Sequence, residues 1–119
     1  KKKKKKSGKP ELPDPIDFAT FERIGLRVGK VLSAEKHPNA DNLLVLQVDI
    51  AEEKPRQIVA GIADAFTPDA LVGRTVVVVA NLKPADLRGV ESQGMLLAAG
   101  GKKVVDLVGV NAAPGEVVR

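Results

Sequence analysis

The sequence predicts one small all-β domain, a barrel of short strands, and three observations support this fold class. The chain has 119 residues, the length of a single domain. Its apolar residues gather in five short segments that Gly, Pro, Asn and Asp residues separate. No apolar run approaches the ~20 residues of a membrane-spanning helix, so we expect no membrane crossing and no membrane partner.

The predicted domain begins near residue 18, after a tail. Residues 1–17 hold seven lysines and three closely spaced prolines, which predicts a disordered tail or linker. Asp17 is suited to cap a short helix across residues 18–23. A first strand is expected over residues 26–33, where Gly25 and Gly29 favour a bent or bulged backbone. The folded domain is therefore expected over residues 18–119.

The next three elements follow from alternation and turn chemistry. In the second strand, residues 43–50, one face carries four apolar side chains: Leu44, Leu46, Val48 and Ile50. A third strand is expected over residues 56–60, after a polar turn. Residues 67–73 predict one helical turn, in which Thr67 caps, Pro68 opens and Gly73 stops the helix.

Two further strands complete the pattern. Residues 75–80 contain four consecutive valines, so both faces of this strand are expected to be covered. A fifth strand is expected over residues 94–99, and residues 100–103 predict a hairpin turn. Five strands with a small helix between the third and fourth fit an OB-fold barrel. A six-stranded sandwich would give a similar pattern, so periodicity alone supports only a small β-barrel.

The positive charge is concentrated in the tail. The chain has 19 Lys and Arg residues against 15 Asp and Glu residues, a net charge of +4. Removing the seven lysines of residues 1–9 leaves 12 against 15, a net charge of −3. A basic arm of this kind attracts polyanions. The alternative is that the lysines are a solubility tag or a linker remnant.

The composition disfavours catalysis and metal binding. With no cysteine and one histidine, thiolate zinc sites, disulfides and multi-histidine sites are excluded. His37 lies in a turn and is expected to bond local backbone, while Glu52 and Glu53 are expected to be solvated surface charges. We therefore expect no catalytic residue, no metal ion and no cofactor.

The connection over residues 81–95 is the strongest candidate for binding. It is predicted to be a loop that holds Asn, Lys, Arg, Ser and Gln around backbone fixed by Pro84, Gly89 and Gly94. Such a loop can present amide and hydroxyl groups and two cations to one ligand. The chain has no Trp or Tyr and three Phe, too few for a base-stacking platform. A nucleic-acid partner would be recognised through backbone charge, 2′-hydroxyls and folded shape.

Several motifs resemble those of a known family. They are RQIVAGI at 56–62, LVGRTVVVVANLKP at 71–84 and GVESQGMLLAA at 89–99, with LRVGKV at 26–31 and HPNAD at 37–41 upstream. Together they resemble the tRNA-binding domain found at the C-terminus of methionyl-tRNA synthetases and in stand-alone bacterial tRNA-binding proteins. The sequence departs from the family pattern at Gly25, where aspartate is expected, and at Asn42, where lysine is common.

The resemblance implies an OB-fold with a C-terminal extension and a non-catalytic, structure-selective tRNA-binding module. It also implies a cytoplasmic location, a homodimer, and fusion to or association with an aminoacyl-tRNA synthetase. By motif position, the RNA-binding residues would be Asn81, Lys83, Ser92, Gly94 and Met95; Arg88 is added for its charge.

Two observations bear on alternative functions. The four valines at 76–79 and the apolar pairs within residues 104–118 suggest surface that a second subunit would bury. The near-neutral folded part favours a homodimerisation or scaffold module whose RNA binding comes mainly from the basic tail. An extracellular signalling fragment is a third class that the sequence leaves open.

Overall fold

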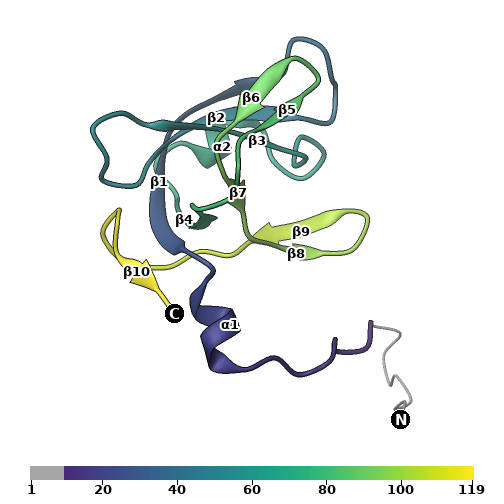
Figure 1. Cartoon of the computed structure of the whole chain (residues 1–119). Helices are drawn as coiled ribbons and strands as arrows, with labels where there is room; N and C mark the ends of the chain where they lie inside the picture. Colours follow the sequence, from purple (N-terminus) through teal and green to yellow (C-terminus); the bar gives the residue numbers. More distant parts are fainter. Residues whose placement is uncertain (1–9) are drawn as a thin grey trace.

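The computed structural model describes residues 10–119, and its strands and two short helices are shown in Figure 1. The expected basic arm of residues 1–9 lies outside the described residues. Residues 10–17 are exposed and form neither helix nor strand. Helix α1 (Phe18–Glu22) follows, and the Asp17 carboxylate accepts a hydrogen bond from the Thr20 backbone N–H at 2.9 Å. The predicted cap is confirmed.

The main sheet is antiparallel, with strand order β3-β2-β1-β4-β7, and β10 also pairs with β1. Its strands are β1 (Leu26–Lys36), β2 (Leu44–Asp49), β3 (Arg56–Ala60), β4 (Thr75–Val79), β7 (Met95–Leu96) and β10 (Val117–Val118). Two hairpins lie outside it: β5 (Ala85–Leu87) with β6 (Val90–Ser92), and β8 (Ala98–Gly100) with β9 (Val104–Leu107). Between β3 and β4 lies helix α2 (Pro68–Leu71), as predicted, although the Thr67 side chain makes no capping hydrogen bond.

Strand β1 bends so that it serves both halves of the sheet. Its first half pairs with β4 and its second half with β2, and the register shifts between Val31 and Ser33. Gly29 lies at the crossing, where an added Cβ would stand 2.6 Å from Val48 Cγ1 and 2.9 Å from Val78 Cγ2. A side chain has no room there, so the predicted bent, glycine-containing strand is confirmed.

The core lies inside the curved sheet. Leu44, Leu46 and Val48 are fully buried and Ile50 nearly so, as the alternation predicted. Leu71 of α2 joins the same cluster and is fully buried. The helix thus contributes an apolar side chain to the barrel interior, which explains its position between β3 and β4.

The four valines of β4 are all buried within this single chain. The segment that follows β7 continues the pairing along β4: Val77 N–H donates to the Val108 carbonyl, and Leu97 N–H donates to the Val77 carbonyl. The expectation of two covered faces is confirmed, but the inference that the valines need a second subunit is wrong. The predicted fifth strand is divided into β7, which pairs with β4, and β8, which pairs with β9.

The sheet closes on itself through side chains and one backbone bond. The Gln93 N–H donates to the Gln57 carbonyl at 2.7 Å. The Gln57 N–H donates to the Gln93 side-chain oxygen, and the Val59 N–H donates to the Ser92 hydroxyl, both at 2.9 Å. These bonds join β3 to the end of β6 and to Gln93 just after it, which makes the sheet a nearly closed barrel. The predicted OB-like barrel is confirmed, with residues 104–119 as the C-terminal extension.

Candidate nucleic-acid interface

Much of the predicted loop over residues 81–95 is in fact the β5–β6 hairpin. Its two turn residues, Arg88 and Gly89, have φ angles of 56° and 93°, as a two-residue turn with left-handed geometry requires. The Asp86 carboxylate accepts a hydrogen bond from the Gly89 N–H at 2.8 Å. The turn is therefore locally ordered, and it presents the exposed Arg88 side chain at its tip.

This hairpin is bonded to the HPNAD turn between β1 and β2. The His37 Nε2 lies 2.9 Å from the Leu87 carbonyl oxygen. The Asn39 side-chain amide donates to the Arg88 carbonyl at 3.4 Å. Figure 1 shows the hairpin and the β1–β2 connection together at one end of the barrel. We call this surface, residues 37–41 with residues 83–91, the turn–hairpin face.

The hydrogen bonds of His37 fix its tautomer. Its Nδ1 accepts from the Asn39 backbone N–H at 2.9 Å, so Nε2 carries the hydrogen and donates to Leu87. The side chain is buried. The expectation that His37 bonds local backbone is confirmed, and its second bond extends to a segment 50 positions away.

The six predicted RNA-binding residues fall into two groups. Lys83 and Arg88 are exposed, and the Met95 side chain is 46% exposed on β7. Ser92 is only 4% exposed, and its hydroxyl accepts from Val59 N–H and donates to the Gly94 carbonyl at 3.0 Å. The Ser92 hydroxyl thus both accepts and donates a hydrogen bond within the protein.

Gly94 and Asn81 also have internal roles. An added Cβ at Gly94 would stand 3.2 Å from the Val79 carbonyl oxygen, so glycine permits a close approach to β4. The Asn81 amide donates to the Arg23 carbonyl at 2.7 Å and accepts from the Gly25 N–H at 2.8 Å. Asn81 therefore fastens the link between α1 and β1 to the end of β4.

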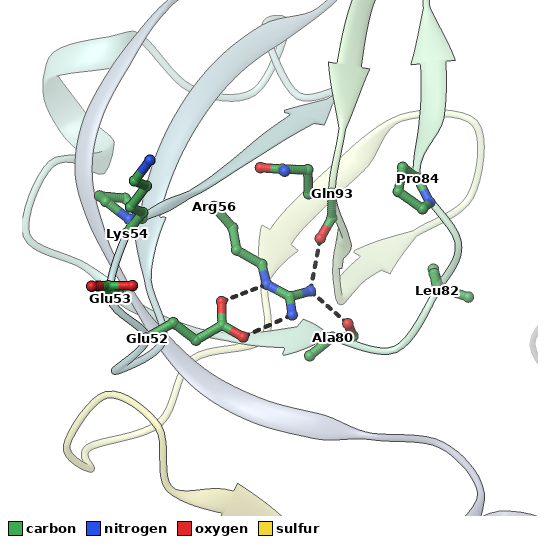
Figure 2. Close-up of a pocket in the computed structure, with 9 residues that line it drawn as sticks. Glu52, Glu53, Lys54, Arg56, Ala80, Leu82, Pro84 and Gln93 are labelled. Carbon is green, nitrogen blue, oxygen red and sulfur yellow. Dashed lines mark hydrogen bonds and ion pairs between the residues drawn. The ribbon is translucent and has the colours of Figure 1, made fainter.

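The Arg56 guanidinium bonds several acceptor atoms at once, and the sequence did not indicate this role. The guanidinium makes two hydrogen bonds to Glu52, each 2.9 Å, and donates to the Ala80 and Gln93 carbonyls (Figure 2). The Glu52 hydrogen bonds raise the pKa of Arg56, and the Arg56 hydrogen bonds lower the pKa of Glu52. Glu52 and Glu53 are both exposed, as expected, but Glu52 is also held in an ion pair with Arg56 that was not predicted.

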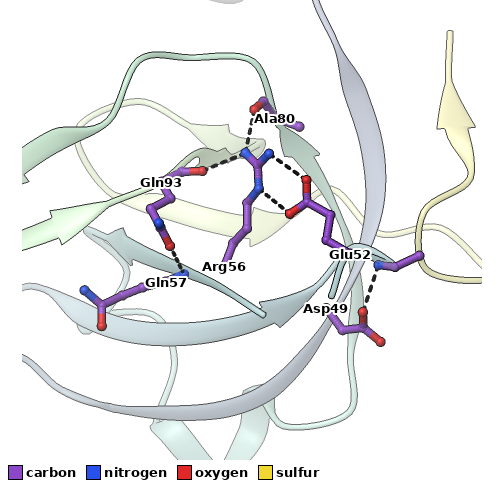
Figure 3. Close-up of polar contacts among 7 residues, drawn as sticks. Asp49, Glu52, Arg56, Gln57, Ala80 and Gln93 are labelled. Carbon is purple, nitrogen blue, oxygen red and sulfur yellow. Dashed lines mark hydrogen bonds and ion pairs between the residues drawn. The ribbon is translucent and has the colours of Figure 1, made fainter. Parts of the chain in front are cut away.

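Figure 3 shows that the Arg56 contacts continue into the barrel closure through Gln93 and Gln57. Arg56 also lines an open hollow of about 510 Å³, together with Leu82 and Pro84. Two of the four acceptor atoms bonded by the Arg56 guanidinium are main-chain carbonyl oxygens. Any residue type carries such an oxygen, so no sequence pattern marks this contact. The one available signal was the spacing of Glu52 and Arg56, four positions apart.

Within residues 10–119, no three His, Cys, Asp or Glu side chains are grouped as a metal site requires. No helix in the described part of the chain is long and apolar enough to cross a membrane.

Comparisons with known proteins agree with the fold. A family model described as "Putative tRNA binding domain" matches residues 26–116. The chain is 51% identical over 98 residues to a methionine–tRNA ligase of Methanocella arvoryzae, covering 82% of this chain and 14% of that protein. It is 46% identical over 117 residues to a cytoplasmic tyrosine–tRNA ligase of Xenopus tropicalis, covering 94% of this chain and 22% of the ligase.

A solved structure gives the same result in three dimensions. The MetRS-related protein of Pyrococcus horikoshii superposes with a TM-score of 0.82 at 38% identity, covering 90% of this chain and 100% of that one. The chain spans less than a quarter of the length of the two ligases. The match over residues 26–116 takes in both the HPNAD turn and the β5–β6 hairpin. The chain therefore belongs to the tRNA-binding domain family.

Proposed function

We propose that this domain is a structure-selective tRNA-binding module and that the turn–hairpin face contacts the RNA. The observation that carries this proposal is the bonding of the HPNAD turn to the β5–β6 hairpin. In OB-folds, the loops that follow the first and fourth barrel strands form part of the usual nucleic-acid surface. In this chain those two loops are joined into one surface with little freedom left to lose on binding.

The charge of this face indicates how it acts. Lys83 and Arg88 are its two cations, and Asp41, Asp86 and Glu91 are its acidic residues. Without an excess of positive charge, the face contributes little general attraction to a polyanion. Its contribution is selectivity, through fixed donors that match the shape and 2′-hydroxyls of a folded RNA. Recognition of this kind is largely independent of base sequence.

The direct contacts are proposed for Lys83, Arg88 and Met95, whose side chains are exposed. Asn81, Ser92 and Gly94 are proposed to hold the surrounding backbone in place. The Asn81 amide and the Ser92 hydroxyl bond groups within the protein, and Gly94 permits a close approach to β4. The three residues thus support the surface without supplying its contacts.

The domain is proposed to act in the cytoplasm together with an aminoacyl-tRNA synthetase, either fused to it or associated with it. The methionyl-tRNA synthetase is the preferred candidate. The named ligases contain a closely similar segment. The proposed role is to raise the local tRNA concentration without chemistry of its own.

A homodimer is also proposed, on grounds other than the valines of β4. Ile24 and Leu82 are exposed apolar residues, and both line one hollow. A second subunit would bury this apolar surface. Sedimentation equilibrium should give twice the chain mass for the wild type and a monomer for Leu82→Glu. A monomeric wild type at all concentrations would reject the dimer.

A second function, a scaffold whose RNA binding comes from the tail, is favoured by the net charge of −3 from residue 10 onward. A salt titration of binding to tRNA and to an unstructured RNA of equal length, with and without residues 1–9, separates the two. The proposed function requires that the truncated chain still prefers tRNA. If preference disappears with the tail, the scaffold function is correct.

A further inference from the structure

The His37 ring is the one titratable group that joins the two halves of the turn–hairpin face among the described residues. It is 6% exposed, and both ring nitrogens are bonded to main-chain groups. Nδ1 accepts from the Asn39 N–H, while Nε2 donates to the Leu87 carbonyl. This pairing needs a neutral ring, since a protonated imidazole has no acceptor.

We propose that His37 is a positioning residue that makes tRNA selection by the turn–hairpin face sensitive to pH; this inference rests on the proposed function. Protonation places a second N–H on Nδ1, 2.9 Å from the Asn39 N–H. Two donors then face each other, and the new charge lies on a buried ring. The turn can relieve this conflict by moving Asn39 away, which takes its side chain from the Arg88 carbonyl.

The charged residues near His37 and Leu87 along the chain are Glu35, Lys36, Asp41, Lys83, Asp86, Arg88 and Glu91. Among residues 10–119, no carboxylate lies within ion-pairing distance of the ring. Asp86 accepts a hydrogen bond from the Gly89 N–H. A ring protonated in its present place would therefore have no carboxylate paired with it.

The expected effect of acid on tRNA selection is opposite to the usual effect of acid on RNA binding. Lowering the pH adds positive charge to most RNA-binding proteins and strengthens their binding to any polyanion. Here the same protonation disturbs the surface that selects tRNA. Because the chain has one histidine, a substitution of His37 removes every imidazole and tests whether the effect belongs to this ring.

The experiment measures the affinity of the full chain for a tRNA transcript and for an unstructured RNA of equal length, at about pH 7.5 and about pH 5.5. The ratio of the two affinities should fall about two- to tenfold for the wild type at the lower pH, the range expected for one hydrogen bond. His37→Gln keeps a donor toward Leu87 and does not titrate, so its ratio should not change with pH. An unchanged or rising wild-type ratio, or an equal fall in His37→Gln, overturns the proposal.

A measurement on the wild type alone covers the case in which His37→Gln does not fold. In an NMR titration, the Leu87, Arg88 and Gly89 amide signals should move with the same midpoint as the imidazole nitrogens. If the ring titrates while these amides stay unmoved, the coupling is absent and the proposal is rejected. A wild type without tRNA preference at about pH 7.5 would instead reject the proposed function, whatever the NMR titration shows.

Discussion

The Nε2 of His37 lies 2.9 Å from the carbonyl oxygen of Leu87 and joins two segments that are 50 positions apart. Arg88, the next residue, starts the hairpin turn with a φ of 56°. The neighbouring backbone bond therefore helps to fix the main chain from which the Arg88 side chain projects. Because the anchor is a main-chain carbonyl, it does not use the Arg88 side chain, which stays exposed.

Arg88 and Lys83 should each contribute about one phosphate contact. Arg88→Gln should weaken tRNA binding and flatten the slope of log affinity against log salt by about 0.7–0.9. Lys83→Gln should act in the same way, and the double substitution should add the two effects. Filter binding of a tRNA transcript over a series of salt concentrations measures the slope.

The control for this pair is Lys102→Gln, an exposed lysine in the other hairpin, between β8 and β9. It should leave the preference for tRNA unchanged. If Lys102→Gln changes the slope as much as Arg88→Gln does, the turn–hairpin face is not the RNA-binding surface.

Local pattern predicted much of the fold. The alternation at Leu44 and Leu46 and the cap at Asp17 depend on neighbouring residues, and the structure confirms both. The β5–β6 hairpin was not predicted, because Ala85–Leu87 is exposed throughout and lacks the alternation of a half-buried strand. The burial of the four valines was expected, but the pairing of β4 with residues 97 and 108 was not, since they lie about 20–30 positions onward and bond through backbone groups.

The Glu52–Arg56 ion pair should make stability depend on acid pH. Hydrogen bonds from Arg56 lower the pKa of Glu52 in the folded state. Such a group contributes stability above its unfolded pKa, about 4.3, and loses it as the pH falls through the lower folded value. Glu52→Gln should therefore lower the free energy of unfolding at pH 7 by about 0.3–1 kcal/mol, and this difference should vanish in acid.

Glu53→Gln is the matched control, because Glu53 is exposed and makes no ion pair within the described residues. Urea unfolding at a series of pH values measures both variants. A Glu52→Gln deficit that persists unchanged below about pH 3 would show that the ion pair is not its cause.

Arg56→Lys should destabilise the barrel although it keeps the charge. A lysine cannot bond Glu52 through two nitrogens while also donating to the Ala80 and Gln93 carbonyls. The expected loss is about 1–3 kcal/mol in the free energy of unfolding, measured by urea denaturation. Lys54 is exposed and lines the same hollow. Lys54→Ala should change the free energy of unfolding by no more than about 0.5 kcal/mol. Equal losses in the two variants would contradict a special role for Arg56.

The sequence predicted a set of candidate residues, but it did not tell which of them are exposed and which are bonded inside the protein. Residue type identified Lys83 and Arg88, because long cationic side chains in a polar connection are seldom buried. It did not distinguish them from Ser92, whose hydroxyl is as able to bond a ligand as to bond Val59. Whether the Ser92 hydroxyl bonds a ligand or the protein depends on how the barrel closes. That closure joins residues 33 positions apart and leaves no local pattern.

Ser92→Ala and Met95→Ala separate support of the surface from contact with RNA. Removing the Ser92 hydroxyl leaves the buried Val59 N–H without its acceptor, so the free energy of unfolding should fall by about 1–3 kcal/mol. Met95 is 46% exposed, so its truncation should change stability by less than about 1 kcal/mol. Ser33→Ala, at an exposed position of β1, is the control for loss of a hydroxyl.

The same two variants should differ in the opposite order when RNA binding is measured. In a temperature range where all variants are folded, Met95→Ala should reduce the preference for a tRNA transcript over unstructured RNA. Ser92→Ala should keep most of that preference, because its hydroxyl faces the protein. The salt slope should stay unchanged in both, since neither residue carries charge. If Ser92→Ala loses preference while its stability matches that of Ser33→Ala, the hydroxyl contacts RNA directly and the assignment of Ser92 to barrel closure is wrong.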